Sequence, residues 1–299
     1  MGLYYGARLA RNGEEVKFLL RTDFDAVRAN GIQVESVAGD FHLGEVAAFR
    51  TSAEIGPVDL VIVAWKSTSN HLFESILPPL LHETTQILTL QNGLGNGELL
   101  AGLFGPQRVL GGLCFVCLNR LASGVVSHTA GGRIAVGEYR VDERGRAEEI
   151  ARRLSAANIP CEAEDNLAAA QWKKLIWNIP FNGLAIAEGG VTTDVLLAAD
   201  GIEDEIRALM TEVVATANQL GLKVDSKLIE SNIERTRPMG PYRPSSMIDF
   251  VEGREVEYEA IWQEPLRRAQ AAGVAVPHLE KLAARIQKRI AERDSKIGG

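Results

Sequence analysis

The chain has 299 residues, 46% hydrophobic and 24% charged, a mixture typical of a globular protein of about two domains, which excludes a disordered chain. Lysine and arginine total 32 against 39 acidic residues, and the net charge of −7 argues against binding to nucleic acid or to an anionic membrane. Three cysteines are too few for a disulfide framework, and neither a membrane span nor a secretion signal is recognisable, so we expect a cytoplasmic enzyme or binding protein.

Residues 1–165 alternate short β-branched runs with helical patterns. The predicted strands are Glu15–Leu20, Leu60–Ala64, Gln86–Leu90, Arg108–Val116, Gly124–Thr129 and Arg133–Gly137. The second and third of these are apolar without alternation, which is typical of parallel strands buried on both faces. Helical segments at Thr68–Leu81 and Gly97–Phe104 lie between strands, so we predict a parallel sheet covered by helices. The stretch Gly31–Val46 predicts an inserted hairpin that turns at Ala38–Asp40.

The rest of the chain has almost entirely helical patterns. The predicted helices are Asn166–Asn178, Ile202–Leu220, Lys227–Arg235, Glu257–Ala272 and Leu279–Arg293. Gly221 and Gly273 follow two of them at the position where glycine ends helices. Asp165 and Asn166 are both suitable caps for the first helix. We therefore predict two domains, residues 1–165 and 166–299.

The opening of the sequence is similar to the second half of a mononucleotide-binding βαβ unit. A helix starting at Gly2 closes at Gly13, and the strand Glu15–Leu20 follows. The first strand and the first two glycines of a G-x-G-x-x-G fingerprint are missing, so Gly2 can be only its third glycine. The simplest explanation is a start assigned about a dozen residues too late. Taken literally, the chain should bind a dinucleotide poorly, and an ordinary peripheral helix–strand unit is the alternative.

Arg21 ends this strand at the place where such a unit contacts the adenosine ribose. An acidic residue there accepts a hydrogen bond from the 2′-hydroxyl, whereas a cation favours a 2′-phosphate. The residue therefore favours NADP over NAD. An arginine solvated at a strand end is the alternative interpretation.

Two further segments carry polar residues beside glycine or serine. The segment Leu90–Gly95 ends a buried strand in a glycine-rich turn, at the carboxyl edge where open α/β sheets bind ligands. Pro244–Met247, which contains two serines, leads into the acidic stretch Glu252–Glu259. Each segment alone is a weak signal.

A third segment places polar residues on one helical face. Lys174, Asn178 and Asn182 are four residues apart and therefore lie on consecutive turns. Pro180 falls between them and removes one backbone donor, so we expect it to interrupt the helix and to displace Asn182.

Together these segments resemble the ketopantoate reductase (2-dehydropantoate 2-reductase) family. In that family a strand ends in N-G-x-G, a helix carries K-x-x-x-N-x-x-x-N, and an S-M motif precedes a helix with E-x-[DE]. The resemblance extends from Gly2 to about Arg289 with the motifs in the same order. It implies an α/β fold, with a Rossmann-like, mostly parallel sheet that lacks its first strand and an all-helical carboxyl-terminal domain. It also implies NADPH-dependent reduction of 2-dehydropantoate to (R)-pantoate in pantothenate biosynthesis.

The resemblance implies roles for individual residues. Lys174 would donate the proton to the carbonyl oxygen, where an ammonium stabilises the charge that develops as hydride arrives. Glu257 would be the essential carboxylate near the nicotinamide and the substrate. The residues expected to bind substrate are Asn92, Asn178, Asn182 and Ser246. The residues expected to bind the cofactor are Gly2, Arg21, Lys66, Asn92 and Glu257.

Structural interpretations of the same residues stay open. Lys173 and Lys174 could form a solvated face, and Glu255–Glu259 could be an acidic run that pairs with Arg267 and Arg268. The C-x-x-C motif lies in a strand pattern and is expected to be structural, and the histidines lack ligand spacing, so no metal is predicted.

The alternative functions are a paralogous reductase of another 2-oxo acid, a non-catalytic NADP-binding sensor and an inactive truncated product. The helical domain is compatible with a homodimer.

Overall fold

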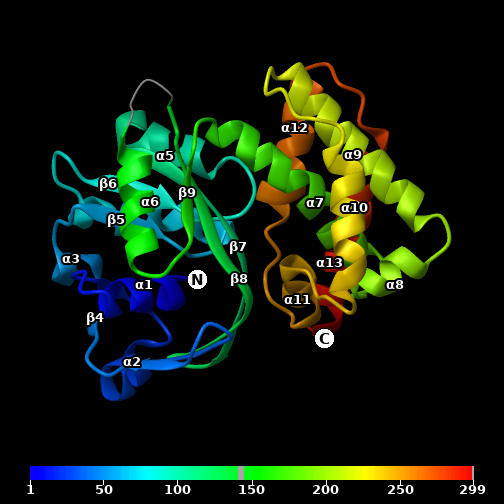
Figure 1. The fold of residues 1–299 in the computed structure, drawn as a ribbon. Coiled ribbons are helices and arrows are strands. Elements are labelled where there is room, and N and C mark those ends of the chain that lie inside the picture. Colours follow the sequence, from blue (N-terminus) through cyan, green and yellow to red (C-terminus); the bar gives the residue numbers. More distant parts are fainter. Residues whose placement is uncertain (141–144, 298–299) are drawn as a thin grey trace. The chain divides into compact units, whose positions relative to one another are not determined.

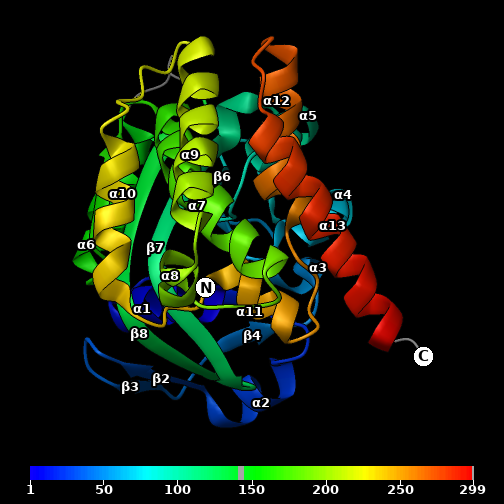
Figure 2. The same cartoon turned by 90° about the vertical axis from the view of Figure 1, so that its right-hand side faces the viewer.

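The computed structural model describes residues 1–140 and 145–297 (Figures 1 and 2). The chain divides into two compact units. The sheet unit comprises Met1–Gln91 and Asn96–Leu167, and the helical unit comprises Asn92–Gly95 and Ala168–Gly299. The short segment Asn92–Gly95 therefore belongs to the helical unit, although its neighbours in sequence on both sides belong to the sheet unit. Among the described residues, no helix is both long and apolar enough to cross a membrane.

The sheet unit is built on a mostly parallel sheet, as predicted. Its strands follow the order β3-β2-β8-β7-β6-β5, and β9 pairs with β8. Their bounds are β2 Ile32–Ser36, β3 Phe41–Leu43, β5 Leu60–Val63, β6 Gln86–Thr89, β7 Val109–Ala122, β8 Val125–Glu138 and β9 Cys161–Glu164. Among the described strands, only the pairs β7–β8 and β2–β3 are antiparallel, and the second of these is the predicted hairpin.

A separate parallel pair, β1 (Lys17–Leu19) and β4 (Ala47–Phe49), completes the strands of this unit. Within the described ranges, neither β1 nor β5 has a strand on its second edge. In a doubly wound sheet of order 3-2-1-4-5-6, the first strand would lie between the two strands that correspond to β1 and β5. In the described residues, β1 and β4 thus form a sheet separate from the one that ends at β5.

Helices cover the sheet unit. Their bounds are α1 Gly2–Arg11, α2 Phe24–Asn30, α3 Ser52–Ile55, α4 Phe73–Ile76, α5 Asn96–Phe104 and α6 Arg146–Ala156. The buried face of α1 packs into the same apolar cluster as Phe18 of β1, and a Cβ on Gly6 would lie only 2.6 Å from the Phe18 ring. The helix predicted over residues 68–81 is reduced to α4 between two 3₁₀ turns. Pro78 and Pro79, which supply no N–H donors, account for its end.

Two predictions about strands were incomplete. The strands β7 and β8 form one long hairpin (Figure 1), whereas the prediction ended the first at Val116 and divided the second after Thr129. Gly131 and Gly132, which lie between the two predicted strands, both have positive φ, but the ladder continues past them with irregular register. The helix α6 was not predicted, and neither was β9, because the sequence Cys161–Glu164 has little apolar character.

The helical unit contains the predicted helices, with changed bounds, together with two short helices beginning at Thr193 and Ser245 that were not predicted. They are α7 Leu167–Ala187, α8 Thr193–Ala198, α9 Ile202–Gln219, α10 Leu228–Thr236, α11 Ser245–Val251, a π-helical turn Glu259–Gln263, α12 Glu264–Ala271 and α13 Pro277–Ile297. The helix α9 contacts α10, α12 and α13, and Figure 2 shows α10 beside it. Their apolar faces enclose one core that includes Trp172, Phe181 and Trp262.

The helix α7 is continuous through Pro180, which corrects the expectation of an interruption. Proline inside a helix costs about 3 kcal/mol, because it removes one hydrogen bond and crowds the preceding turn. Ile179 and Phe181 on either side of it are completely buried, and so are Leu184 and Ile186 in the next turns. Burial of these side chains offsets the lost hydrogen bond and keeps Asn182 in the helix.

Candidate active site

The predicted polar residues of α7 become more buried along the helix. Lys174 is half-buried, Asn178 is 9% exposed and Asn182 only 1% exposed. Because the helix is unbroken, these side chains lie on consecutive turns of one face. The helix therefore carries an ammonium at one end of a polar row that continues into the core.

Lys174 has a specific partner. Its Nζ donates a hydrogen bond to Oδ1 of Asn92 at 2.8 Å. The neighbouring Lys173 is exposed, so the interpretation as a solvated face holds for Lys173 and not for Lys174. Asn92 stands at the start of the glycine-rich turn, in which Gly93 and Gly95 have φ of 80° and 89°. Glycine adopts these left-handed conformations without strain, and the turn can therefore bring Asn92 to α7.

A second hydrogen bond joins α7 to the serine motif. Oδ1 of Asn182 accepts from the backbone N–H of Ser246 at 2.9 Å, and Ser246 is buried. The first-turn N–H of α11 would otherwise have no helical acceptor. The amide of Asn182 thus has a structural task in addition to its predicted one, since it holds Ser246 beside α7.

Glu257 differs from the acidic residues near it. Its side chain is 7% exposed, whereas Glu255 and Glu259 are exposed and Glu259 pairs with Arg267. The interpretation as a solvated acidic run therefore holds for Glu259 and not for Glu257. A buried carboxylate is retained in proteins where charged or hydrogen-bonding groups surround it, as at a functional site.

The segment Asn92–Gly95 connects these parts of the helical unit. Asn92 binds Lys174, and two residues later the Leu94 N–H donates to the carbonyl of Ala260 at 2.9 Å. Ala260 is three residues after Glu257. The structure thus brings Lys174, Asn92 and the stretch that carries Glu257 together. Sequence analysis missed Leu94 and Ala260, because their contribution comes from backbone atoms.

The predicted cofactor residues Gly2, Arg21 and Lys66 belong to the sheet unit. Arg21 is exposed two residues after the end of β1 and has no hydrogen bond or ion pair with any described residue. The nearby Asp23 is held by Arg120 at 2.7 Å. Lys66 follows β5, and Gly2 opens α1, where an added Cβ would contact only Ala64 at 3.5 Å.

The residues at these strand ends fit a phosphorylated dinucleotide. Carboxyl ends of parallel strands are the edge at which such sheets bind nucleotides, and Arg21 and Lys66 place cations there. The indole Nε1 of Trp65, next to Lys66, is buried without a hydrogen-bond partner in the described part of the chain. This edge therefore has an unused donor as well as positive charge. The glycine turn that binds a pyrophosphate precedes such a helix and is not in the sequence.

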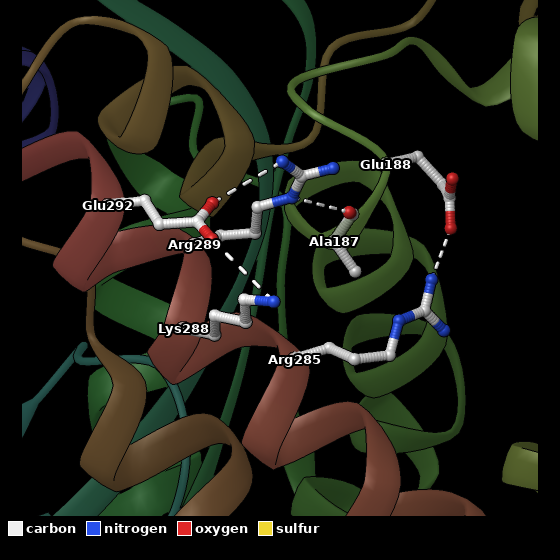
Figure 3. A pocket seen from close by; sticks show the side chains of 6 residues that line it. All are labelled: Ala187, Glu188, Arg285, Lys288, Arg289 and Glu292. Atoms are coloured by element: carbon white, nitrogen blue, oxygen red, sulfur yellow. Dashed lines mark hydrogen bonds and ion pairs between the residues drawn. The ribbon is translucent and has the colours of Figure 1, made fainter.

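A cavity of about 320 Å³ in the helical unit contains none of these residues (Figure 3). It is lined by Ala187, Glu188, Arg285, Lys288, Arg289 and Glu292. Figure 3 shows that its charges pair among themselves: Arg285 with Glu188, and both Lys288 and Arg289 with Glu292. Each of its three cations is paired with a carboxylate, and none of the predicted site residues lines it, so we do not place the active site in this cavity.

A mostly parallel sheet with cations at its strand ends, followed by a helical unit that holds a lysine ammonium, is the organisation of a dinucleotide-dependent oxidoreductase. Comparison with known proteins agrees. The family model described as "Ketopantoate reductase PanE/ApbA" matches residues 1–140, and its C-terminal counterpart matches residues 166–289. The chain belongs to the ketopantoate reductase family, as its motifs predicted.

Individual relatives cover nearly the whole chain. A 2-dehydropantoate 2-reductase of Nostoc is 38% identical over 94% of this chain and 90% of the relative. The crystal structure of 2-dehydropantoate 2-reductase from Geobacter metallireducens is 45% identical, covers 96% of both chains and superposes with a TM-score of 0.93. That from Methylococcus capsulatus is 31% identical, with a TM-score of 0.90 over 98% of this chain and 94% of the other. The chain is thus an oxidoreductase acting on CH–OH groups with a nicotinamide cofactor.

Proposed function

We propose that the protein reduces 2-dehydropantoate to (R)-pantoate with NADPH, in the biosynthesis of pantothenate. The observation that carries the proposal is the Lys174 ammonium held by Asn92 at 2.8 Å, inside the motif order of the reductase family. The relative from Nostoc at 38% identity acts on this acid by name, which favours it over other 2-oxo acids.

The reaction needs a proton donor at the carbonyl oxygen. NADPH, when bound, supplies the hydride to the carbonyl carbon. Lys174 stabilises the negative charge that develops on the oxygen and transfers one Nζ proton to it, which leaves a neutral amine that regains a proton from water. Asn92 accepts from the same Nζ and so orients the donor before the substrate arrives.

The remaining residues hold the acid. Asn178 presents an amide one turn from Lys174, with a donor for the substrate carboxylate and an acceptor for its hydroxyl. Ser246, fixed by Asn182, presents a hydroxyl from the first turn of α11. Glu257 is a buried carboxylate, and we assign it to the substrate and the nicotinamide.

NADPH is proposed over NADH because of the sheet unit. Arg21 is an exposed cation without a protein partner in the described residues, so it is available to a 2′-phosphate. Lys66, Gly2 and Asn92 complete the proposed cofactor contacts. The three cysteines, of which Cys114 is buried, form no disulfide among the described residues, which suits the reducing cytoplasm in which we place the reaction.

The proposal is tested by NADPH oxidation with a panel of 2-oxo acids. We expect the highest kcat/KM with 2-dehydropantoate and a lower value with NADH. Activity highest with another 2-oxo acid would replace the substrate and keep the reaction. A chain that binds NADPH but oxidises it with no acid would be a sensor, and the proposal would be rejected.

A further inference from the structure

A break in the hydrogen bonding between Glu257 and α12 has a specific chemical cause. The turn Glu259–Gln263 is π-helical, and the N–H of Glu264 donates to the carbonyl of Glu259, five residues earlier. In an α-helix that N–H would donate to Ala260. The next residue is Pro265, which has no N–H to offer. The helix therefore provides no hydrogen bond to the carbonyl of Ala260, because Glu264 donates to Glu259 and Pro265 has no N–H.

The bypassed carbonyl is used by the glycine-rich turn. The N–H of Leu94 donates to the carbonyl oxygen of Ala260 at 2.9 Å. The contact is close, since a Cβ on Gly93 would lie 2.4 Å from the same oxygen. Leu94 itself is buried in the core of the helical unit. The segment Asn92–Gly95 is thus attached to the turn around Ala260 in three ways: by a backbone hydrogen bond, by close approach of the two backbones and by burial of the Leu94 side chain.

The attachment has a consequence for the proton donor. Asn92 is the first residue of the attached segment, and its Oδ1 accepts from the Lys174 ammonium. A segment that contains two glycines in left-handed conformations would otherwise be free to move. Its position is instead determined by the Ala260 carbonyl, for which the helix supplies no competing N–H at residue 265.

We propose that Pro265 is a positioning residue for catalysis: by keeping the Ala260 carbonyl free, it docks the Asn92–Gly95 segment and so orients the Lys174 ammonium through Asn92. This inference rests on the proposed role of Lys174. π-helical turns are frequent at functional sites, and here the turn supplies an acceptor to a loop instead of binding a ligand. The series of contacts is continuous in the structure, from Pro265 through Ala260, Leu94 and Asn92 to Lys174.

The substitution Pro265→Ala tests the proposal. Alanine restores an N–H that competes with Leu94 for the Ala260 carbonyl, so we expect kcat to fall about three- to tenfold while the Kd for NADPH is unchanged. Because alanine is a good helix former, the melting temperature should change by less than about 4 °C. Pro277→Ala, the same change at the first residue of α13, is the matched control and should keep full activity.

A double-mutant cycle separates positioning from a general effect on the fold. In the Asn92→Ala background, Pro265→Ala should have no further effect on kcat, because its action passes through Asn92. Equal losses in both backgrounds would overturn the proposal, and so would a Pro265→Ala variant with wild-type kcat.

A measurement that does not depend on enzyme activity tests the docking even if the proposed reaction is wrong. Amide hydrogen exchange of the Leu94 N–H, measured without substrate, should become at least about fivefold faster in Pro265→Ala and stay unchanged in Pro277→Ala. Unchanged exchange at Leu94 would overturn the docking itself. Faster exchange in a chain that reduces no 2-oxo acid would reject the proposed function and leave the docking established.

Discussion

The Nζ of Lys174 and the Oδ1 of Asn92 are 2.8 Å apart, although the residues are separated by 82 positions in the sequence. Asn92 follows the last residues of a strand of the sheet unit, yet it belongs to the helical unit through its contacts. The proposed proton donor and the residue that orients it are therefore held within one unit of the fold.

Removal of the ammonium should abolish most of the proton transfer. We expect Lys174→Ala to lower kcat by about 10²–10⁴-fold with little change in the Kd for NADPH, because a positioned acid contributes that much. Steady-state kinetics and cofactor titration measure the two quantities. Lys173→Ala, which removes the exposed neighbouring ammonium, is the control and should keep kcat. A Lys174→Ala variant with more than a tenth of wild-type activity would contradict the assignment.

The choice between NADPH and NADH should depend on Arg21. Arg21→Ala removes the cation proposed for the 2′-phosphate, so kcat/KM for NADPH should fall about 10–100-fold while that for NADH stays the same. Arg28→Ala, another arginine of the sheet unit, serves for comparison and should change neither value. Equal losses with both cofactors would show that Arg21 supports the fold and does not bind the 2′-phosphate.

The stability of the helical unit should depend on Glu212, a buried residue of α9. Its two carboxylate oxygens accept from the N–H groups of His278 and Leu279 at 2.9 and 2.8 Å, in the first turn of α13. Glu212→Ala leaves these donors without an acceptor, and we expect it to lower the free energy of unfolding by about 2–4 kcal/mol. Denaturant unfolding measures the loss.

Glu212→Gln keeps one acceptor oxygen and should lose about half as much. Thr211→Ala, at the exposed neighbouring position, should change the stability by less than about 0.5 kcal/mol. Similar values for all three variants would show that α13 is capped in another way.

The reactivity of Cys161 should be low at neutral pH. Burial raises the pKa of its thiol from 9.0 to about 12, and the nearby Cys114 adds to the increase. The thiolate fraction at pH 8 is then about a thousandfold below that of an ordinary cysteine, and alkylation should be slower by a similar factor. Iodoacetamide labelling with peptide mapping measures the rate, and the protein in guanidinium provides the unhindered reference.

The same pKa shift affects stability at high pH. The folded thiol keeps its proton between about pH 9 and 12, whereas the unfolded thiol loses it. The free energy of unfolding should therefore fall as the pH rises through this window, and less steeply in Cys161→Ser. An identical slope in that variant would assign the effect to other groups.

Local patterns in the sequence were sufficient for most elements. Continuous apolar runs predicted β5 and β6, and apolar residues at helical spacing predicted α9, α10 and α13 within a few residues. The motif order was sufficient for the family, and the spacing of Lys174, Asn178 and Asn182 for a shared helical face. These features depend on neighbours within a few positions, and the sequence contains them directly.

Tertiary contacts decided the features that depend on distant residues. The burial of Glu257 between the exposed Glu255 and Glu259 follows from what packs on each side chain, and the three are alike in sequence. The continuity of α7 through Pro180 is decided by a core that residues from several helices build. The attachment of Leu94 to Ala260 uses backbone atoms, which every residue has, so no side-chain pattern can specify it; only the folded path of the chain brings that donor to that acceptor.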